Sequence, residues 1–149
     1  MSKAYEPIII GIDGGGSRTR GILYKGTQEL AQSETSTARV GTVGVVESAE
    51  RILNLISDLI TQAKLPNREL DAVLIGLAGT WLKEEQLRSQ QLISLLAKRE
   101  RKIDIDKLLV TSDAAIALDA AFEGEHGIVL IVGTGTIAIA KTQIGRAHV

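Results

Sequence analysis

The chain of 149 residues contains no cysteine, only two prolines, and four aromatic residues: one Trp, two Tyr and one Phe. Without cysteine, these residues can form neither a disulfide framework nor a thiolate metal site. Only His126 and His148 carry an imidazole, so a histidine-based metal site is not expected. Apolar residues nevertheless make up 44% of the chain. Ile, Leu, Val and Ala must therefore build the core, which at this length can be sizeable.

The sequence also lacks an excess of charge of one sign. Lys and Arg number 17, Asp and Glu number 18, and the formal net charge is -1. We therefore expect no binding to nucleic acid or to an anionic membrane surface. No apolar run approaches the roughly 18 residues of a membrane span. The residues before Ile8 do not show the basic segment and long apolar stretch of a signal peptide. The expectation is a cytoplasmic protein of one domain or one lobe.

Hydrophobic periodicity divides the chain into strands and helices. Short β-branched segments joined by short turns predict an antiparallel meander, at residues 7–12, 19–24 and 29–33. Later strands are predicted at 72–78 and 107–110. The helical period predicts helices at 45–63, 83–99 and 114–122. Within the second of these helices, the residues expected to face the core are Leu87, Leu92, Leu95 and Leu96.

The resulting order, β-β-β-α-β-α-β-α, defines the fold class. Alternating strands and helices predict parallel strands with right-handed crossovers, and the opening meander adds an antiparallel edge. We therefore predict an α/β, ribonuclease-H-like (actin-like ATPase) lobe. Its sheet is expected to be mixed and five-stranded, with helices on both faces.

A second glycine-bearing hairpin near the C-terminus repeats the first. Residues 128–132 and 137–140 match the two strands around the first glycine cluster, which predicts the first hairpin of a second, similar lobe. We assign residues 1–123 to the first lobe and residues 124–143 to the start of a truncated second lobe. The final residues, 144–149, are interpreted as a non-native tail, because "IGRAHV" back-translates to a common sequencing adapter.

The first glycine cluster, Gly14, Gly15 and Gly16, ends a buried strand directly after Asp13. Glycines permit close backbone approach and positive φ, and consecutive turn amides form an anion nest. A Walker A loop would need a lysine that is missing here. A Rossmann fingerprint would need a helix where residues 19–24 predict a strand. The pattern therefore predicts a hairpin phosphate loop, although a plain tight turn capped by Asp13 is the alternative.

The surrounding residues extend this prediction to a metal ion and to a second phosphate-binding turn. The Ser17 hydroxyl is expected to donate to phosphate, and Asp13 is expected to face it through Mg²⁺ and water. The second hairpin supplies a facing turn that could clamp the same polyphosphate from the opposite side. The turn consists of Gly133, Thr134, Gly135 and Thr136.

Asp113 is the candidate catalytic base. It follows a predicted strand and opens a predicted helix, where a carboxylate stays ionised. Ligands in open α/β sheets lie beyond the carboxyl ends of the strands, and Asp13 and Gly79 end strands too. A carboxylate there can take a proton from a substrate hydroxyl during phosphoryl transfer, typically worth about 10²–10⁴-fold in rate. The alternative for Asp113 is an ordinary helix N-cap.

Four motifs in order resemble the BadF/BadG/BcrA/BcrD-type ATPase family, which includes N-acetylglucosamine kinases. They are "GIDGGGSRTRGILY", "LIGLAGT", "TSDAAIALDAAF" and "IVLIVGTGTIAIA", and they span nearly all of residues 8–142. The resemblance implies two lobes with ATP and Mg²⁺ in the cleft between them. It implies a small-molecule sugar as phosphoryl acceptor. Whether the full-length protein forms a homodimer stays an open question.

The same resemblance implies roles for particular residues. Residues 13–17 correspond to the first phosphate loop with Asp13 on the metal side, residues 133–136 to the second, and Asp113 to the base. Substrate contacts are implied for Thr37, Ala38, Gly79 and Thr80. Ala38 stands where the amino-sugar kinases have an Asn that contacts the sugar, so the identity of the acceptor stays open.

Two further functions are compatible with the sequence. The first is an ATPase that activates a partner enzyme such as a 2-hydroxyacyl-CoA dehydratase or a benzoyl-CoA reductase. Such activators hold a shared iron–sulfur cluster through cysteines, which this chain lacks. The second is a ligand-sensing actin-like module without turnover, which would not need a base at position 113.

Overall fold

The computed structural model describes residues 5–112, 127–133 and 136–142, and these ranges contain two sheets. The first is five-stranded with the order β3-β2-β1-β4-β5, and the second pairs β6 with β7. The elements are β1 (Ile8–Gly14), β2 (Arg18–Lys25), β3 (Gln28–Ser36), α1 (Val40–Val43), α2 (Val45–Ala63), β4 (Glu69–Leu77), α3 (Lys83–Glu100), β5 (Asp104–Thr111), β6 (Gly127–Gly133) and β7 (Thr136–Thr142).

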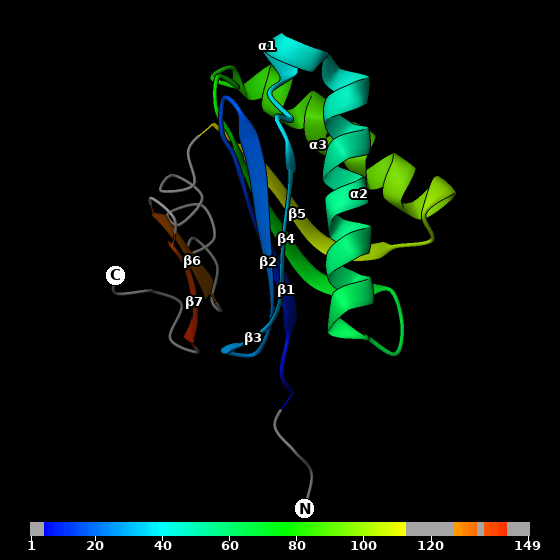
Figure 1. Cartoon of the computed structure of the whole chain (residues 1–149), viewed down its shortest axis with the longest axis vertical. Helices are drawn as coiled ribbons and strands as arrows, with labels where there is room; N and C mark the ends of the chain where they lie inside the picture. The colour runs from blue at the N-terminus through cyan, green and yellow to red at the C-terminus, as the bar shows by residue number, and fades with distance from the viewer. Residues whose placement is uncertain (1–4, 113–126, 134–135, 143–149) are drawn as a thin grey trace, which may run out of the picture.

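The sheet is mixed, as the sequence predicted. β1 pairs antiparallel with β2 and parallel with β4, and β4 pairs parallel with β5. The α/β class is therefore confirmed. Both long helices, α2 and α3, lie on one face of this sheet (Figure 1). The helix predicted at 114–122 lies outside the described residues.

The main core lies between the sheet and α2. Ile10 and Ile12 of β1 pack against α2 residues such as Ile52 and Leu59, and all four are fully buried. The predicted bounds of α2 match the observed ones because its apolar residues recur at helical spacing over five turns. The helix ends at Lys64, which adopts the left-handed conformation.

The prediction for α3 was wrong about two of its leucines. Leu87 and Leu95 are 44% and 49% exposed, whereas Ile93 and Ala97 are buried. Leu92 and Leu96 pack at the edge of the core, as predicted. The reason is geometric: α3 covers only the edge strand β5 and one side of α2, so its buried stripe is narrow. α1 was not predicted, since a single turn leaves no periodic signal.

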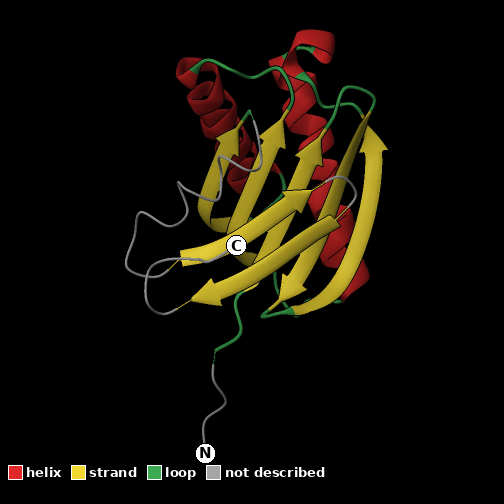
Figure 2. Ribbon diagram, turned by 90° about the vertical axis from the view of Figure 1, so that its left-hand side faces the viewer, coloured by secondary structure: helices red, strands yellow, loops and turns green. Residues whose placement is uncertain are grey.

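The other face of the sheet carries a second, smaller apolar cluster. It consists of Ile9, Ile22, Tyr24, Ala72 and Leu74, with Leu109 at its margin. The β6–β7 hairpin lies over this face, opposite the helices (Figures 1 and 2). Strand alternation puts Asp13 on this same face, because Ile9 and Asp13 are four residues apart along β1.

No helix in the described ranges is long and apolar enough to cross a bilayer.

Candidate functional site

The carboxyl ends of β1, β4 and β5 meet at one edge of the sheet. The strand registers align Asp13 with Gly76, and Gly76 with Thr111. These three residues therefore form one row across three strands, on the face that is turned away from the helices. Arg20 of β2 continues the row next to Asp13. Thr111 is buried and was not predicted, although it ends the strand that leads to Asp113.

The glycine segment forms a tight turn between β1 and β2. The amide N–H of Gly15 donates to the carbonyl of Arg18 at 2.8 Å, which leaves Gly16 and Ser17 at an exposed tip. The predicted hairpin is therefore present. Positive φ is not what the turn needs, however, because none of the three glycines lies in the left-handed region.

The space around the α-carbon differs among the three glycines of the turn. A Cβ on Gly14 would lie 2.6 Å from Cδ2 of Leu77 and 3.2 Å from the carbonyl oxygen of Gly76, so the packing of β4 excludes it. A Cβ on Gly15 would lie 3.4 Å from the Arg18 carbonyl oxygen, an ordinary contact. A Cβ on Gly16 would meet nothing within 4 Å. Only the tip of the turn thus borders open space, where a ligand could approach the backbone.

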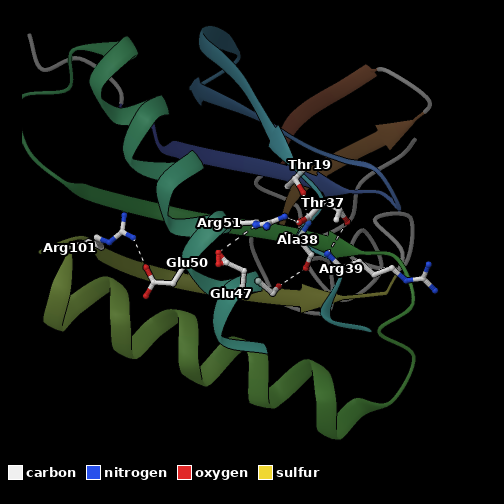
Figure 3. Close-up of polar contacts among 9 residues, drawn as sticks. Thr19, Thr37, Ala38, Arg39, Glu47, Glu50, Arg51 and Arg101 are labelled. Carbon is white, nitrogen blue, oxygen red and sulfur yellow. Dashed lines mark hydrogen bonds and ion pairs between the residues drawn. The ribbon is translucent and has the colours of Figure 1, made fainter. Parts of the chain in front are cut away.

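The segment after β3 is tied directly to this turn. The Thr37 hydroxyl donates to the carbonyl of Gly15 at 3.1 Å and accepts from the amide of Arg39 at 3.1 Å. The amide of Ala38 donates to Thr19 Oγ1 at 2.9 Å, and Ala38 is fully buried (Figure 3). The predicted substrate residues 37 and 38 therefore lie beside the predicted phosphate turn.

The start of α2 holds the same segment from the other side. Ser48 Oγ donates to the carbonyl of Ala38 at 2.5 Å, and Arg51 Nη1 donates to the carbonyl of Thr37 at 2.8 Å. Arg51 also pairs with Glu47 at 3.7 Å (Figure 3). Sequence reasoning missed Thr19, Ser48 and Arg51, because nothing in a single sequence indicates which backbone groups such side chains will meet.

The turn after β4 contributes Gly79 and Thr80. Gly79 has a φ of 85°, a conformation that favours glycine. A Cβ there would lie 2.9 Å from Nε of Arg39, so the guanidinium covers this glycine. Thr80 is buried, and its carbonyl accepts from Gln86 Nε2 at 2.9 Å. The next residue, Trp81, is 73% exposed.

The remaining predicted residues are only partly described. Gly133 and Thr136 are register partners at the end of the β6–β7 hairpin, as the internal repeat predicted. Thr134, Gly135 and Asp113 lie outside the described residues. The site as described is therefore one half of the predicted arrangement: the glycine turn, the segment 37–39 and the turn at Gly79.

The donor set suits a cation that is held only partly by protein. The half-buried carboxylate of Asp13 ends β1 beside the glycine turn. In the described ranges, no group of three or more His, Asp or Glu side chains could form a complete protein cage. Mg²⁺ commonly binds through one or two carboxylates, waters and substrate phosphates. Asp13 fits that mode of binding, in which phosphate oxygens would complete the coordination.

Comparisons with known proteins agree on one family. The model of the BadF/BadG/BcrA/BcrD ATPase family matches residues 10–148. An N-acetylmuramic acid/N-acetylglucosamine kinase from Clostridium acetobutylicum is 30% identical over 144 residues, which cover 93% of this chain and 44% of that protein. An N-acetyl-D-glucosamine kinase from Dictyostelium discoideum is 25% identical over 97% of this chain and 46% of that protein. The chain thus spans less than half the length of these curated relatives.

Solved structures share the fold. A Chromobacterium violaceum protein assigned as an N-acetylglucosamine kinase is 25% identical, with a TM-score of 0.56 over 84% of this chain and 41% of that chain. The ROK hexokinase from Thermus thermophilus, 17% identical, has a TM-score of 0.55 over 93% of this chain and 47% of that chain. The second likeness concerns the fold alone.

Proposed function

Because the chain belongs to the BadF/BadG/BcrA/BcrD ATPase family, as its motifs predicted, we propose that it is the nucleotide-binding lobe of a sugar kinase. The reaction is the transfer of the γ-phosphoryl group of ATP to a hydroxyl of a small sugar, with an amino sugar such as N-acetylglucosamine as the acceptor. The supporting observation is the hydrogen bond of 3.1 Å between Thr37 and the Gly15 carbonyl. It joins the expected acceptor segment to the expected phosphate turn, as phosphoryl transfer between the two ligands requires.

The glycine turn is proposed to bind the phosphates. Its exposed tip, Gly16 and Ser17, offers backbone amides and one hydroxyl to an anion. Asp13 lies on the face that carries the β6–β7 hairpin and would hold Mg²⁺ through water. When bound, the metal ion neutralises charge that develops on the transferred group. Gly133, Thr134, Gly135 and Thr136 are proposed as the second phosphate turn.

Asp113 is proposed as the general base. It lies two residues beyond Thr111, the last residue of β5, and would accept the proton of the attacking sugar hydroxyl. Thr37, Ala38, Gly79 and Thr80 are proposed to shape the acceptor side. Ala38 would do so through its backbone, because its methyl group is fully buried.

We further propose that residues 1–123 form this lobe, that residues 124–143 begin a second lobe, and that residues 144–149 are a non-native tail. ATP would bind in the cleft between two lobes, and a single lobe cannot close over its substrates and exclude water. The chain of 149 residues alone is therefore expected to lack kinase activity. A cytoplasmic location of the full-length protein, and its assembly as a homodimer, are predictions from the sequence.

The decisive experiment measures ADP release by the two-lobed protein with ATP, Mg²⁺ and a panel of sugars. Activity with an amino sugar well above the rate with water supports the kinase. ATP hydrolysis that no sugar stimulates would instead favour an ATPase that acts on a partner. Asp113→Asn is expected to lower kcat by about 10²–10⁴-fold. The control is Asp106→Asn, an exposed residue on the same strand, β5, which should keep full activity.

A further inference from the structure

We propose that Arg51 is a positioning residue for phosphoryl transfer. From α2 it fixes the carbonyl of Thr37, and it thereby sets the place of the acceptor segment, residues 37–39, against the glycine turn. This inference rests on the proposed kinase function and deepens it, because it names a residue on which the alignment of the two substrates depends. Sequence reasoning did not select Arg51.

The acceptor segment is held by side chains rather than by a strand ladder. It lies between the last residue of β3 and the first residue of α1. The amide of Ala38 donates to Thr19 Oγ1 at 2.9 Å, and its carbonyl accepts from Ser48 Oγ at 2.5 Å. Because a few side-chain contacts fix this segment, the loss of one of them can shift it.

Arg51 provides a charged contact to the same segment. Its Nη1 donates to the carbonyl of Thr37 at 2.8 Å, next to the carbonyl that Ser48 binds. Residues three apart lie on one face of a helix, so Ser48 and Arg51 reach successive carbonyls. A hydrogen bond from a charged donor is stronger than one from a neutral donor. The contact from Arg51 is therefore expected to restrain the segment strongly.

The side chain of Arg51 is itself held in place. Its Nε lies 3.7 Å from Oε1 of Glu47, one turn earlier in α2, and the Arg51 side chain is only 28% exposed (Figure 3). The planar guanidinium group of arginine loses less side-chain entropy for each hydrogen bond that it forms than the flexible ammonium group of lysine does. The donor that meets Thr37 is thus oriented before any ligand binds.

Thr37 connects this helix contact to the proposed phosphate turn. Its carbonyl accepts from Arg51, and its hydroxyl donates to the carbonyl of Gly15 at 3.1 Å. Thr37 is therefore fixed between α2 and the glycine turn. Since the rate of transfer depends steeply on how the two reactants are placed, a displaced Thr37 should slow the reaction.

Arg51 acts through Thr37 and not on the reacting atoms. It belongs to α2, which covers one face of the sheet, whereas the carboxylate of Asp13 lies on the opposite face (Figure 1). The glycine turn also has a contact of its own, because the amide of Gly15 donates to the carbonyl of Arg18 at 2.8 Å. Loss of Arg51 should therefore affect the acceptor step more than the binding of ATP.

The test measures initial rates of the two-lobed protein with ATP, Mg²⁺ and N-acetylglucosamine. Arg51→Met keeps an unbranched apolar stem and removes the donors. It is expected to lower kcat about 10- to 100-fold, since a small misplacement of the reactants is enough for such a loss. The Kd of ATP, measured by calorimetry, should change less than about three-fold. Arg51→Lys keeps the charge and one donor, and it should recover part of kcat.

Arg101→Met is the matched control. Arg101 pairs with Glu50 of α2 at 2.8 Å, its side chain is 20% exposed, and this pair lies away from the acceptor segment (Figure 3). The variant thus removes a similar contact of α2, and it should keep kcat within about two-fold. An equal loss of kcat in the two methionine variants would assign the effect to the stability of α2 and overturn the proposal. An unchanged kcat in Arg51→Met, or an equal loss of ATP affinity, would overturn it too.

A second measurement does not depend on turnover. If no sugar is phosphorylated by the wild type, the kinase proposal fails, and amide hydrogen exchange of the two-lobed protein still tests Arg51. The amides of Ala38 and Arg39 donate to Thr19 and Thr37. Their exchange should be about 10-fold faster in Arg51→Met and unchanged in Arg101→Met, because only the first variant releases the segment. Equal exchange rates in wild type and Arg51→Met would show that Arg51 does not place the segment.

Discussion

The hydroxyl of Thr37 lies 3.1 Å from the carbonyl oxygen of Gly15, so one side chain joins the segment after β3 to the turn between β1 and β2. The same hydroxyl accepts from the Arg39 amide. A shift of the glycine turn would therefore be transmitted to the residues on which the acceptor is expected to rest.

Thr37→Val should weaken this connection without a change of shape. Both hydrogen bonds are lost, and we expect the free energy of unfolding to fall by about 1–2 kcal/mol. Denaturant titration of the two-lobed protein measures the change. Thr37→Ser keeps the hydroxyl and serves as the matched control, with most of the stability retained. If Thr37→Val costs no stability while Thr37→Ser lowers it, the hydroxyl has no stabilising role and the methyl group is what matters.

The glycines of the turn should respond differently to alanine. Gly14→Ala puts a methyl group 2.6 Å from a side-chain atom of Leu77, which is itself fully buried. The resulting overpacking is expected to cost about 1–3 kcal/mol of stability. Gly16→Ala meets nothing within 4 Å and needs no positive φ, so it should be neutral or stabilise by up to about 1 kcal/mol.

Thermal unfolding of both alanine variants separates packing from ligand binding. Gly14→Ala should lower Tm with or without ATP. Gly16→Ala should keep the Tm of the free protein and reduce the additional stabilisation by ATP, because the methyl group lies at the proposed phosphate contact. Equal loss of Tm in the two free variants would contradict the different environments of the two glycines.

The ionisation of Tyr5 is expected to lower the stability of the folded protein at high pH. Its hydroxyl donates to Oδ1 of Asp71, whose Oδ2 accepts from the amide of Ile8 at 2.6 Å. The hydrogen bond to Asp71, together with burial and nearby carboxylates, raises the pKa of Tyr5 to about 12. Because the folded state favours the neutral phenol, this stabilising contribution is complete below the ordinary pKa near 10. It is lost as the pH rises from about 10 to about 12.

Tyr5→Phe tests this dependence. The difference in absorbance between wild type and variant should titrate near pH 12, and the stability advantage of the wild type should decline across the same interval. The aspartate partner offers a second check, since Asp71→Asn should move the titration of Tyr5 back toward 10. A midpoint near 10 in the folded wild type would contradict the effect of Asp71.

Some features followed from the sequence because they are local. The helical spacing of apolar residues determined α2, and the β-branched runs determined the strands that meet at the site. The glycine segment predicted the hairpin turn, because a strand follows it where other nucleotide folds have a helix. Four ordered motifs were enough to identify the family.

Other features depended on contacts between segments that are distant in the chain, which no local pattern encodes. Gly14 lacks a side chain because Leu77 of β4 occupies the space, and Gly79 lacks one because the turn after β4 holds its φ at 85°. The position of Ala38 is fixed by Thr19 and Ser48, whose hydroxyls bind its backbone amide and carbonyl groups. The sequence by itself determined which strands and long helices form in the first sheet and which family they build. The tertiary structure alone decided which side chains each turn residue meets, because burial and hydrogen bonding at the sheet edge depend on how β1, β4 and α2 pack together.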